Sequence, residues 1–183
     1  MSGSFRLPSS AKTNFVSITW KIPGWKYADA DKLQIVANLL DERLSRDSFS
    51  SIVKAGSSDL FNLYEWAGQF GVYASFSSLT DSIKIQKHLM EVVNAIIEKR
   101  ISESELQLAE QRLLSNVTEM IGKLGFIGSR AELIGEGFLY ANDPGFYILR
   151  LKRQQNLNAN DIQMIARKWL KTKGARLLLI SQK

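Results

Sequence analysis

The stretch NFVSITWKI, residues 14–22, constrains the fold most strongly. Every second residue from Val16 to Ile22 is large and apolar, whereas the residues between them are mostly polar. A period of two is that of a β-strand with one buried face. The turn PGWKYADAD follows, and from residue 32 to residue 44 the apolar positions recur at helical spacing. The chain thus opens with a strand whose apolar face needs a cover, followed by a helix that can supply one.

The remaining chain keeps its strands and helices apart. Asp29 or Asp31 is expected to cap the first helix. The Ser/Gly-rich stretch 45–59 suggests a short helix and a loop, and Ser102 and Glu105 have the spacing of a capping box. Strands are expected at 60–67, 70–78 and 175–181, and further helices at 82–97, 101–124, 129–141, 144–153 and 158–171. This order predicts an α+β fold, with an antiparallel or mixed sheet and helices packed on one face.

A single domain is expected over residues 1–183, because no linker or internal repeat divides the chain. Residues 1–4, MSGS, are explained equally well as part of the protein and as a remnant of an expression vector. An apolar content of 45% and a charged content of 23% are those of a globular protein. No apolar run reaches the length of a membrane span, and the start shows no signal peptide.

The scarcity of metal ligands limits the chemistry of the chain. There is one histidine, His88, and no cysteine. The stretch HLMEV, residues 88–92, would read H-x-x-E-H, the inverted zinc-peptidase signature, if Val92 were histidine. A catalytic zinc ion is usually held by three protein ligands, mostly histidines, which this chain cannot supply. We therefore expect no metal site and no catalytic residue in this chain.

The positive charge of the chain is concentrated near its C-terminus. The formal net charge is +6, and after Asp143 the only acidic residue is Asp161. A basic surface of this kind attracts an acidic partner, although a solvated face is the simpler explanation. Nucleic acid is disfavoured because no aromatic residues alternate with the basic ones. The residues expected to form a partner-contact surface are Arg150, Lys152, Arg153, Lys171 and Lys173.

Two loop motifs leave alternatives open. Trp25 and Tyr27 in PGWKY form either a contact patch between domains or a cover for the end of the sheet. The glycines of GKLGFIGSR, residues 122–130, have the spacing of a weak phosphate-loop pattern. Because this motif follows a helix rather than a strand, a turn between two helices is the better interpretation.

Four segments, taken in order, resemble the C-terminal half-domain of insulinase-, pitrilysin- and mitochondrial-processing-peptidase-like zinc peptidases. They are FRLPSSAKTNFVSITWKIPGWKYADADKLQIVANLLDERLS (5–45), GVYASFSS (71–78), ISESELQLAEQRLLSN (101–116) and LNANDIQMIARKWLKTKGARLLLIS (157–181). The similarity covers nearly all 183 residues. It implies a LuxS/MPP-like metallohydrolase half-domain that packs against a zinc-bearing N-terminal half-domain, in the same or a separate polypeptide.

In this family the zinc motif lies on the first helix of the N-terminal half-domain. The equivalent helix here, residues 32–44, contains no histidine, so HLMEV is a decoy. Active members also carry an Arg and a Tyr seven residues apart in the C-terminal half-domain. The alignment puts Val53 and Leu60 at those positions, which predicts that this substrate-binding pair is absent.

The resemblance therefore implies a noncatalytic half-domain that forms part of a peptide-holding chamber, in a parent that is a zinc metalloendopeptidase acting on peptides. A degenerate peptidase-like scaffold and, less favoured, an anionic-ligand or peptide-binding adaptor are the alternatives. The chain itself is expected to be inactive and to hold no cofactor, with zinc in the partner half. Many bacterial relatives are extracytoplasmic or periplasmic, and only the resemblance suggests that location here.

Overall fold

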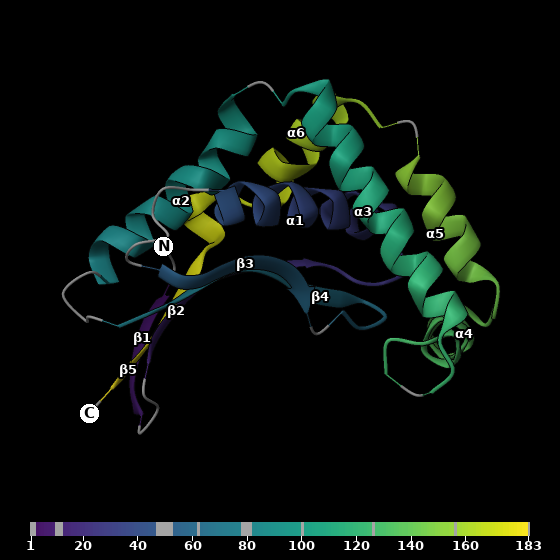
Figure 1. Cartoon of the computed structure of the whole chain (residues 1–183), viewed down its shortest axis with the longest axis horizontal. Coiled ribbons are helices and arrows are strands. Elements are labelled where there is room, and N and C mark those ends of the chain that lie inside the picture. Colours follow the sequence, from purple (N-terminus) through teal and green to yellow (C-terminus); the bar gives the residue numbers. More distant parts are fainter. Residues whose placement is uncertain are drawn as a thin grey trace.

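The sheet and the helices form two layers (Figure 1). The computed structural model describes residues 3–9, 13–46, 53–61, 63–77, 82–99, 101–125, 127–155 and 157–182. Within them a five-stranded sheet lies under a layer of helices, and the lower ends of α3, α4 and α5 descend beside it like one limb of an arch. This arrangement confirms the predicted α+β class with helices on one face.

The sheet is mixed, with the strand order β1-β5-β2-β4-β3. Only β1 and β5 run parallel, whereas β5, β2, β4 and β3 pair in antiparallel fashion. The first and last strands in the sequence are therefore neighbours, and β5 lies between β1 and the central strand β2. The strands are β1 (Gly3–Ser9), β2 (Asn14–Pro23), β3 (Val53–Phe61), β4 (Ala67–Phe76) and β5 (Arg176–Gln182).

The sequence-based prediction was wrong around the edge strands. β1, which includes Gly3 and Ser4, was not predicted, and β3 occupies residues 53–59 of the stretch 45–59 that was expected to be a short helix and a loop. The strand expected at 60–67 is mainly the connection between β3 and β4. β3 is rich in Ser and Gly, which have low strand propensity, so backbone pairing with β4 rather than local preference defines it.

The helices follow the predicted ranges closely, and only α1 begins clearly earlier than expected. Asp29 and Asp31 therefore lie in its first turn rather than at its cap. In the first turn their negative charge still stabilises the N-terminus of the helix. Asn158 caps α6 with its side chain, as Ser102 caps α3. The helices are α1 (Ala28–Arg46), α2 (Ser82–Glu98), α3 (Glu103–Gly122), α4 (Arg130–Ala141), α5 (Phe146–Gln154) and α6 (Ala159–Trp169).

The main core lies between the sheet and the helices α1, α2 and α6. On β2 the side chains from Val16 to Ile22 in steps of two are buried, as the alternation predicted. They meet buried residues of the helices such as Leu40 and Ile162. The indole Nε1 of Trp20 donates to the Lys171 carbonyl oxygen at 3.0 Å, which fixes the end of α6 over β2.

A second buried centre surrounds Trp25, just before α1. Its ring stacks on Phe146 of α5, with ring centroids 4.8 Å apart, and lies 5.7 Å from the ring of Tyr140 of α4. Its Nε1 donates to Glu136 Oε2 at 3.1 Å. Trp25 therefore attaches α4 and α5 to the start of α1, and as a buried residue it does not form an exposed contact patch. Tyr27, in contrast, is exposed.

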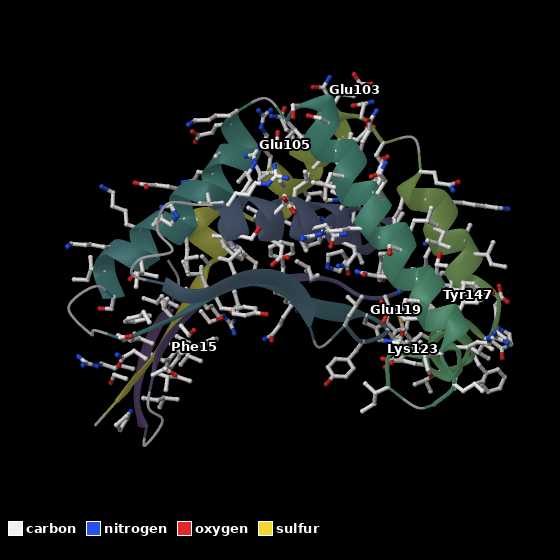
Figure 2. All side chains as sticks on the ribbon, in the orientation of Figure 1. Phe15, Glu103, Glu105, Glu119, Lys123 and Tyr147 are labelled. Carbon is white, nitrogen blue, oxygen red and sulfur yellow. The ribbon has the colours of Figure 1, made fainter. Side chains whose placement is uncertain are left out.

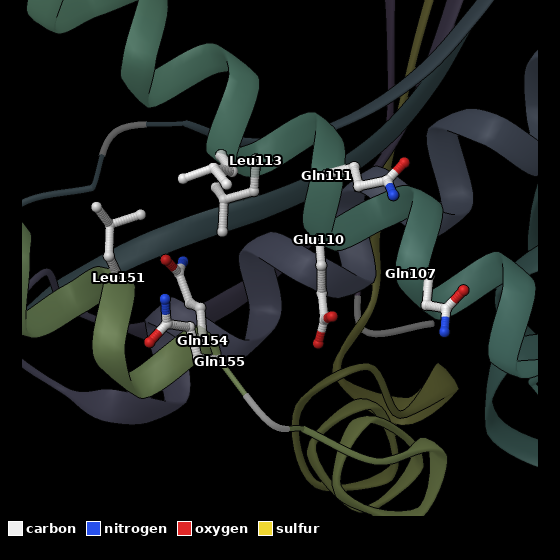
Figure 3. A pocket seen from close by; sticks show the side chains of 8 residues that line it. Gln107, Glu110, Gln111, Leu113, Leu151, Gln154 and Gln155 are labelled. Atoms are coloured by element: carbon white, nitrogen blue, oxygen red, sulfur yellow. The ribbon is translucent and has the colours of Figure 1, made fainter.

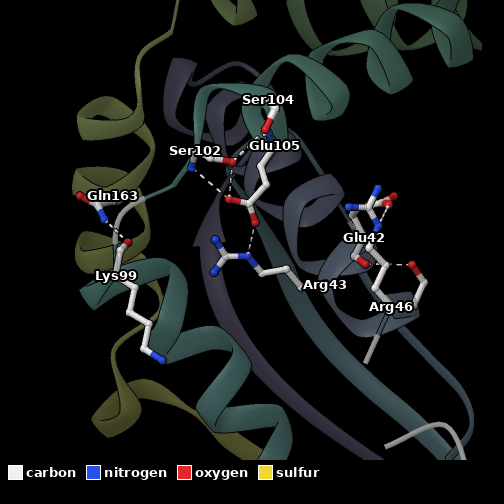
Figure 4. Close-up of polar contacts among 9 residues, drawn as sticks. Glu42, Arg43, Arg46, Lys99, Ser102, Ser104, Glu105 and Gln163 are labelled. Carbon is white, nitrogen blue, oxygen red and sulfur yellow. Dashed lines mark hydrogen bonds and ion pairs between the residues drawn. The ribbon is translucent and has the colours of Figure 1, made fainter. Parts of the chain in front are cut away.

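A polar cluster fixes the start of α3 against α1 (Figure 4). Ser102 Oγ accepts from the Glu105 backbone N–H, and Glu105 Oε2 accepts from the Ser102 backbone N–H, which completes the predicted capping box. Arg43 of α1 donates from Nε to Glu105 Oε1 at 2.9 Å. Partial burial works to raise the pKa of Glu105, but the hydrogen bonds from Arg43 and Ser102 outweigh it and lower the pKa from 4.5 to about 2.

Replacing the indole of Trp25 is expected to destabilise the protein strongly. Trp25→Ala removes the contacts with α4 and α5 and leaves a cavity, so the free energy of unfolding falls by about 3 to 5 kcal/mol. Urea unfolding followed by circular dichroism measures this change. Tyr27→Ala, two residues away and exposed, is the matched control, with an expected change of about 0.5 kcal/mol or less. Equal losses in the two variants would contradict the role of Trp25 as an anchor.

The lowered pKa of Glu105 predicts a pH-dependent contribution to stability. A carboxyl group with a depressed pKa in the folded state stabilises the fold fully above its ordinary pKa, 4.5, and loses this effect as the pH falls toward 2. Glu105→Gln is therefore expected to lower the free energy of unfolding at pH 7 by about 1 kcal/mol, as for other cap residues. The deficit should shrink between pH 4.5 and pH 2. Exposed Glu103→Gln is the control, and a deficit of the same size at both ends of this range would disprove the linkage.

Candidate functional site

The HLMEV stretch lies on α2 and does not form a metal centre. The buried stripe of this helix includes Ile85, Leu89 and Val92, while Glu91 is exposed and pairs with Lys87 at 3.8 Å. Among the described residues, no three His, Cys, Asp or Glu side chains gather closely enough to hold a metal ion. The residues that the structure describes therefore do not fit the zinc ion of the related peptidases.

The start of α1 carries a buried carboxylate. Asp31 is fully buried and accepts a hydrogen bond from Arg150 Nε at 2.6 Å and one from Arg153 Nη1 at 3.3 Å. Burial raises the pKa of Asp31, although the two guanidinium groups act in the opposite direction. Gln154 donates from Nε2 to the Asp31 carbonyl oxygen at 2.9 Å. These contacts attach α5 to α1, so the group is structural and not poised for catalysis.

The five basic residues proposed as a contact surface have different environments. Arg150 and Arg153 face inward, since besides Asp31 they lie over the rings of Trp25 and Phe146. Lys152, Lys171 and Lys173 are exposed. Of the five residues, these three lysines are the exposed ones. A partner-contact role for the five residues stays a prediction.

The helix-free face of the sheet is apolar where a surface would usually be polar. Paired residues share a face of the sheet, so the register puts Phe15, Ile180 and Leu7 in one row and Leu178 and Phe5 in the next. None of them is buried, and Phe5 and Leu7 are 62% and 53% exposed. Figure 2 shows Phe15 on the side of the sheet away from the helices.

This apolar face continues onto β4. The ring of Tyr73 lies 5.8 Å from the ring of Phe15, and in the register Tyr73 is opposite Ser17 of β2. Figure 1 shows that this side of the sheet is the concave side of the arch. We call the set Phe5, Leu7, Phe15, Tyr73, Leu178 and Ile180 the helix-free apolar face.

A second exposed apolar surface lies at the far end of the helical layer. Leu124 and Ile127, in the connection between α3 and α4, are each 94% exposed, and Phe138 and Leu139 on α4 are also exposed. An apolar patch of this kind on a globular domain commonly marks a contact surface. The GKLGFIGSR motif is the turn between α3 and α4, as predicted, with Gly125 and Gly128 at positive φ.

Val53 and Leu60 lie on β3, where their backbones pair with Phe76 and Phe70 of β4. A register shift between Val53 and Ala55 gives these two positions partners on the same face of β4. Their assignment to the positions of the family Arg and Tyr stays a prediction.

Comparison with protein-family models identifies the chain. The model described as the peptidase M16 inactive domain matches residues 3–113, which is more than half of the sequence. The chain belongs to this family, as the resemblance implied. No curated protein matches the chain significantly.

Solved structures share the fold at low sequence identity. A protease from Helicobacter pylori has a TM-score of 0.82 at 15% identity, with 98% of this chain and 45% of that chain covered. The inactive peptidase domain of a protein from Bordetella parapertussis has a TM-score of 0.78 at 15% identity, covering 93% and 91% of the two chains. The periplasmic protease PqqL from Escherichia coli has a TM-score of 0.74 at 13% identity, with 99% of this chain and 20% of that chain covered.

The chain thus spans less than half the length of the Helicobacter pylori protease and nearly all of the Bordetella domain. No helix in the described part of the chain combines the length and the apolar character that a membrane span requires.

Sequence reasoning missed the helix-free apolar face, although two signals for it were present. Phe15 is apolar on the otherwise polar side of β2, and RLLLIS in the last strand is apolar at consecutive positions. A strand that is apolar on both sides predicts either burial on both faces or a partner for the second face. β1, which contributes Phe5 and Leu7 to this face, was not recognised as a strand.

Neighbouring residues of β2 test which face of the sheet is the core. Val16→Ser is expected to lower the free energy of unfolding by about 2 to 4 kcal/mol, because it puts a hydroxyl group into the core and leaves a cavity. Phe15→Ser on the helix-free face is expected to cost about 1 kcal/mol, mainly from the lost ring pair with Tyr73. Denaturant unfolding of both variants provides the comparison. A larger loss for Phe15→Ser would show that the second face is covered within the chain.

Proposed function

We propose that this chain is the noncatalytic half-domain of an M16 zinc metallopeptidase and packs against a zinc-bearing half-domain. Its helix-free apolar face then forms part of the wall of a peptide-holding chamber. The observation that carries the proposal is this apolar face, which lies on the concave side of the arch and which no described helix covers. Membership of the inactive-domain family supports it.

The chemistry of the proposed chamber follows from its side chains. An unfolded peptide offers apolar side chains to a surface such as Phe5, Leu7 and Leu178, so binding would depend on contact area rather than on one specific pocket. The exposed lysines Lys152, Lys171 and Lys173 would add attraction for acidic peptides or an acidic partner domain. Zinc and the residues that activate water would come from the other half-domain.

The chain length of a similar protein agrees with a peptidase built from two half-domains. Since the chain covers 45% of the Helicobacter pylori protease, that protein has room for a second domain of similar size. We also propose an extracytoplasmic location, for which the periplasmic protease PqqL gives support by fold alone.

Reconstitution of the two halves tests the proposal. The chain is mixed with the zinc-bearing half-domain of its parent, and cleavage of an unstructured peptide is measured with and without a chelator. Neither half alone should cleave, and the mixture should cleave in a zinc-dependent manner. A stable complex without cleavage would indicate the alternative, a degenerate scaffold. Chelator-sensitive cleavage by the chain alone, dependent on His88, would refute the proposal.

Leu178→Asp in the reconstituted enzyme tests the chamber face. It is expected to raise KM for an apolar peptide by about tenfold with little change in kcat, because it removes contact area and not a reacting group. Ile83→Asp, at an exposed apolar position on α2, is the matched control that separates loss of contact on this face from a general change in charge. An unchanged KM for Leu178→Asp would exclude this face from peptide binding.

A further inference from the structure

A pocket between α3 and α5 has the features of a binding site (Figure 3). It has a volume of about 400 Å³ and lies away from the helix-free apolar face. Its partly or fully buried lining consists of Glu110 and Leu113 from α3 and Leu151 and Gln154 from α5. A few polar groups in an otherwise apolar hollow are typical of ligand sites.

Among the described residues that line this pocket, Glu110 is the only one with an ionisable side chain. Figure 3 shows it projecting from α3 into the space beside Gln154 and Gln155. Its Oε1 atom is buried and has no hydrogen-bond partner among the described residues. Burying a carboxylate oxygen without a hydrogen-bond donor costs free energy, so a ligand that donates to this atom would remove that cost. In agreement, burial raises the pKa of Glu110, with no offsetting contribution from a neighbouring cation.

Two arginines on these helices are engaged elsewhere, and the exposed Lys152 of α5 does not line the pocket. Arg112 on α3 pairs with Asp41 and Glu42 of α1, at 3.1 and 3.2 Å. Arg153 on α5 binds Asp31. No described basic side chain lines the pocket, so a ligand is the source that we consider for a cation to pair with Glu110.

The remaining polar groups favour a ligand with several N–H donors. The Nε2 group of Gln154 is already used, because it donates to the Asp31 carbonyl oxygen, so its side-chain oxygen is left to accept. Gln107, Gln111 and Gln155 at the exposed rim add further amide oxygens. The leucine side chains provide a wall for an aliphatic stem.

We propose that the α3–α5 pocket binds the side chain of an arginine residue in a peptide. The planar guanidinium group donates to the Glu110 carboxylate and the Gln154 side-chain oxygen, and its methylene groups pack on Leu113 and Leu151. A guanidinium group has five N–H donors in a fixed fork, which suits paired acceptors better than a lysine ammonium group does. The pocket is independent of the metal chemistry proposed for the parent, so it can be tested on this chain alone.

The test is a nuclear magnetic resonance titration of the full chain with N-acetyl-arginine amide. Shifts of the Leu113 and Leu151 methyl signals report occupancy. Binding should be strongest for the arginine compound, weaker for N-acetyl-lysine amide, and at least about tenfold weaker for N-acetyl-citrulline amide, which has the same shape without the charge. Equal binding of the citrulline and arginine compounds would overturn the proposal.

Variants locate the site. Glu110→Gln should weaken arginine binding by about tenfold or more, whereas Glu103→Gln, which removes the same charge from the exposed start of the same helix, should leave it unchanged. Gln155→Lys at the exposed rim, where folding is not at risk, puts a competing cation beside Glu110 and should weaken binding as well. Arginine binding that is unchanged in Glu110→Gln and Gln155→Lys, or equally weakened in Glu103→Gln, would refute the site.

Discussion

The one-sided burial of the sheet is the constraint on which the rest of the structure depends. β2 is the central strand, and its apolar face is covered by α1, α2 and α6. Because a strand alternates its side chains, this cover fixes which residues of the neighbouring strands point to the core. A slip of one residue would put Phe15 and Ser17 into the core and expose Val16 and Ile18. The helix-free apolar face is the necessary complement of this choice, since the other half of each strand is directed to the concave side.

A second constraint is the attachment of α4 and α5 to the start of α1. Trp25 supplies the apolar part, and Asp31, buried beneath Arg150, supplies the ionic part. Removing one partner of a buried ion pair lowers the stability of the fold strongly, although the intact pair adds little net stability. The pair therefore acts mainly by fixing this geometry. The same attachment places Gln154 beside α3 and so shapes the wall of the α3–α5 pocket. Elements that support the fold thereby also set the form of a surface available for binding.

The surfaces of this half-domain fit a supporting role in peptide hydrolysis. The described residues provide no metal centre, while apolar side chains lie exposed on the concave face of the sheet and at the α3–α4 connection. A domain that shapes a chamber needs extended contact surfaces rather than reacting groups, because an unfolded peptide is held by many weak contacts. The two exposed surfaces lie on different elements, which allows one to contact a peptide while another contacts a partner domain.

The sequence by itself determined the class of the fold, the main strand β2, most helix positions and the cap at Ser102, because these depend on local periodicity and local hydrogen bonds. Its single histidine and lack of cysteine also led to the expectation that this chain holds no catalytic zinc ion. Only the tertiary structure decided the positions of β1 and β3, whose strand character comes from pairing with β5 and β4 rather than from their own residues. It also decided that Trp25, Arg150 and Arg153 face inward, and that Glu110 of α3 and Gln154 of α5 line the same pocket. Those contacts join residues far apart in the chain, and no local pattern encodes them.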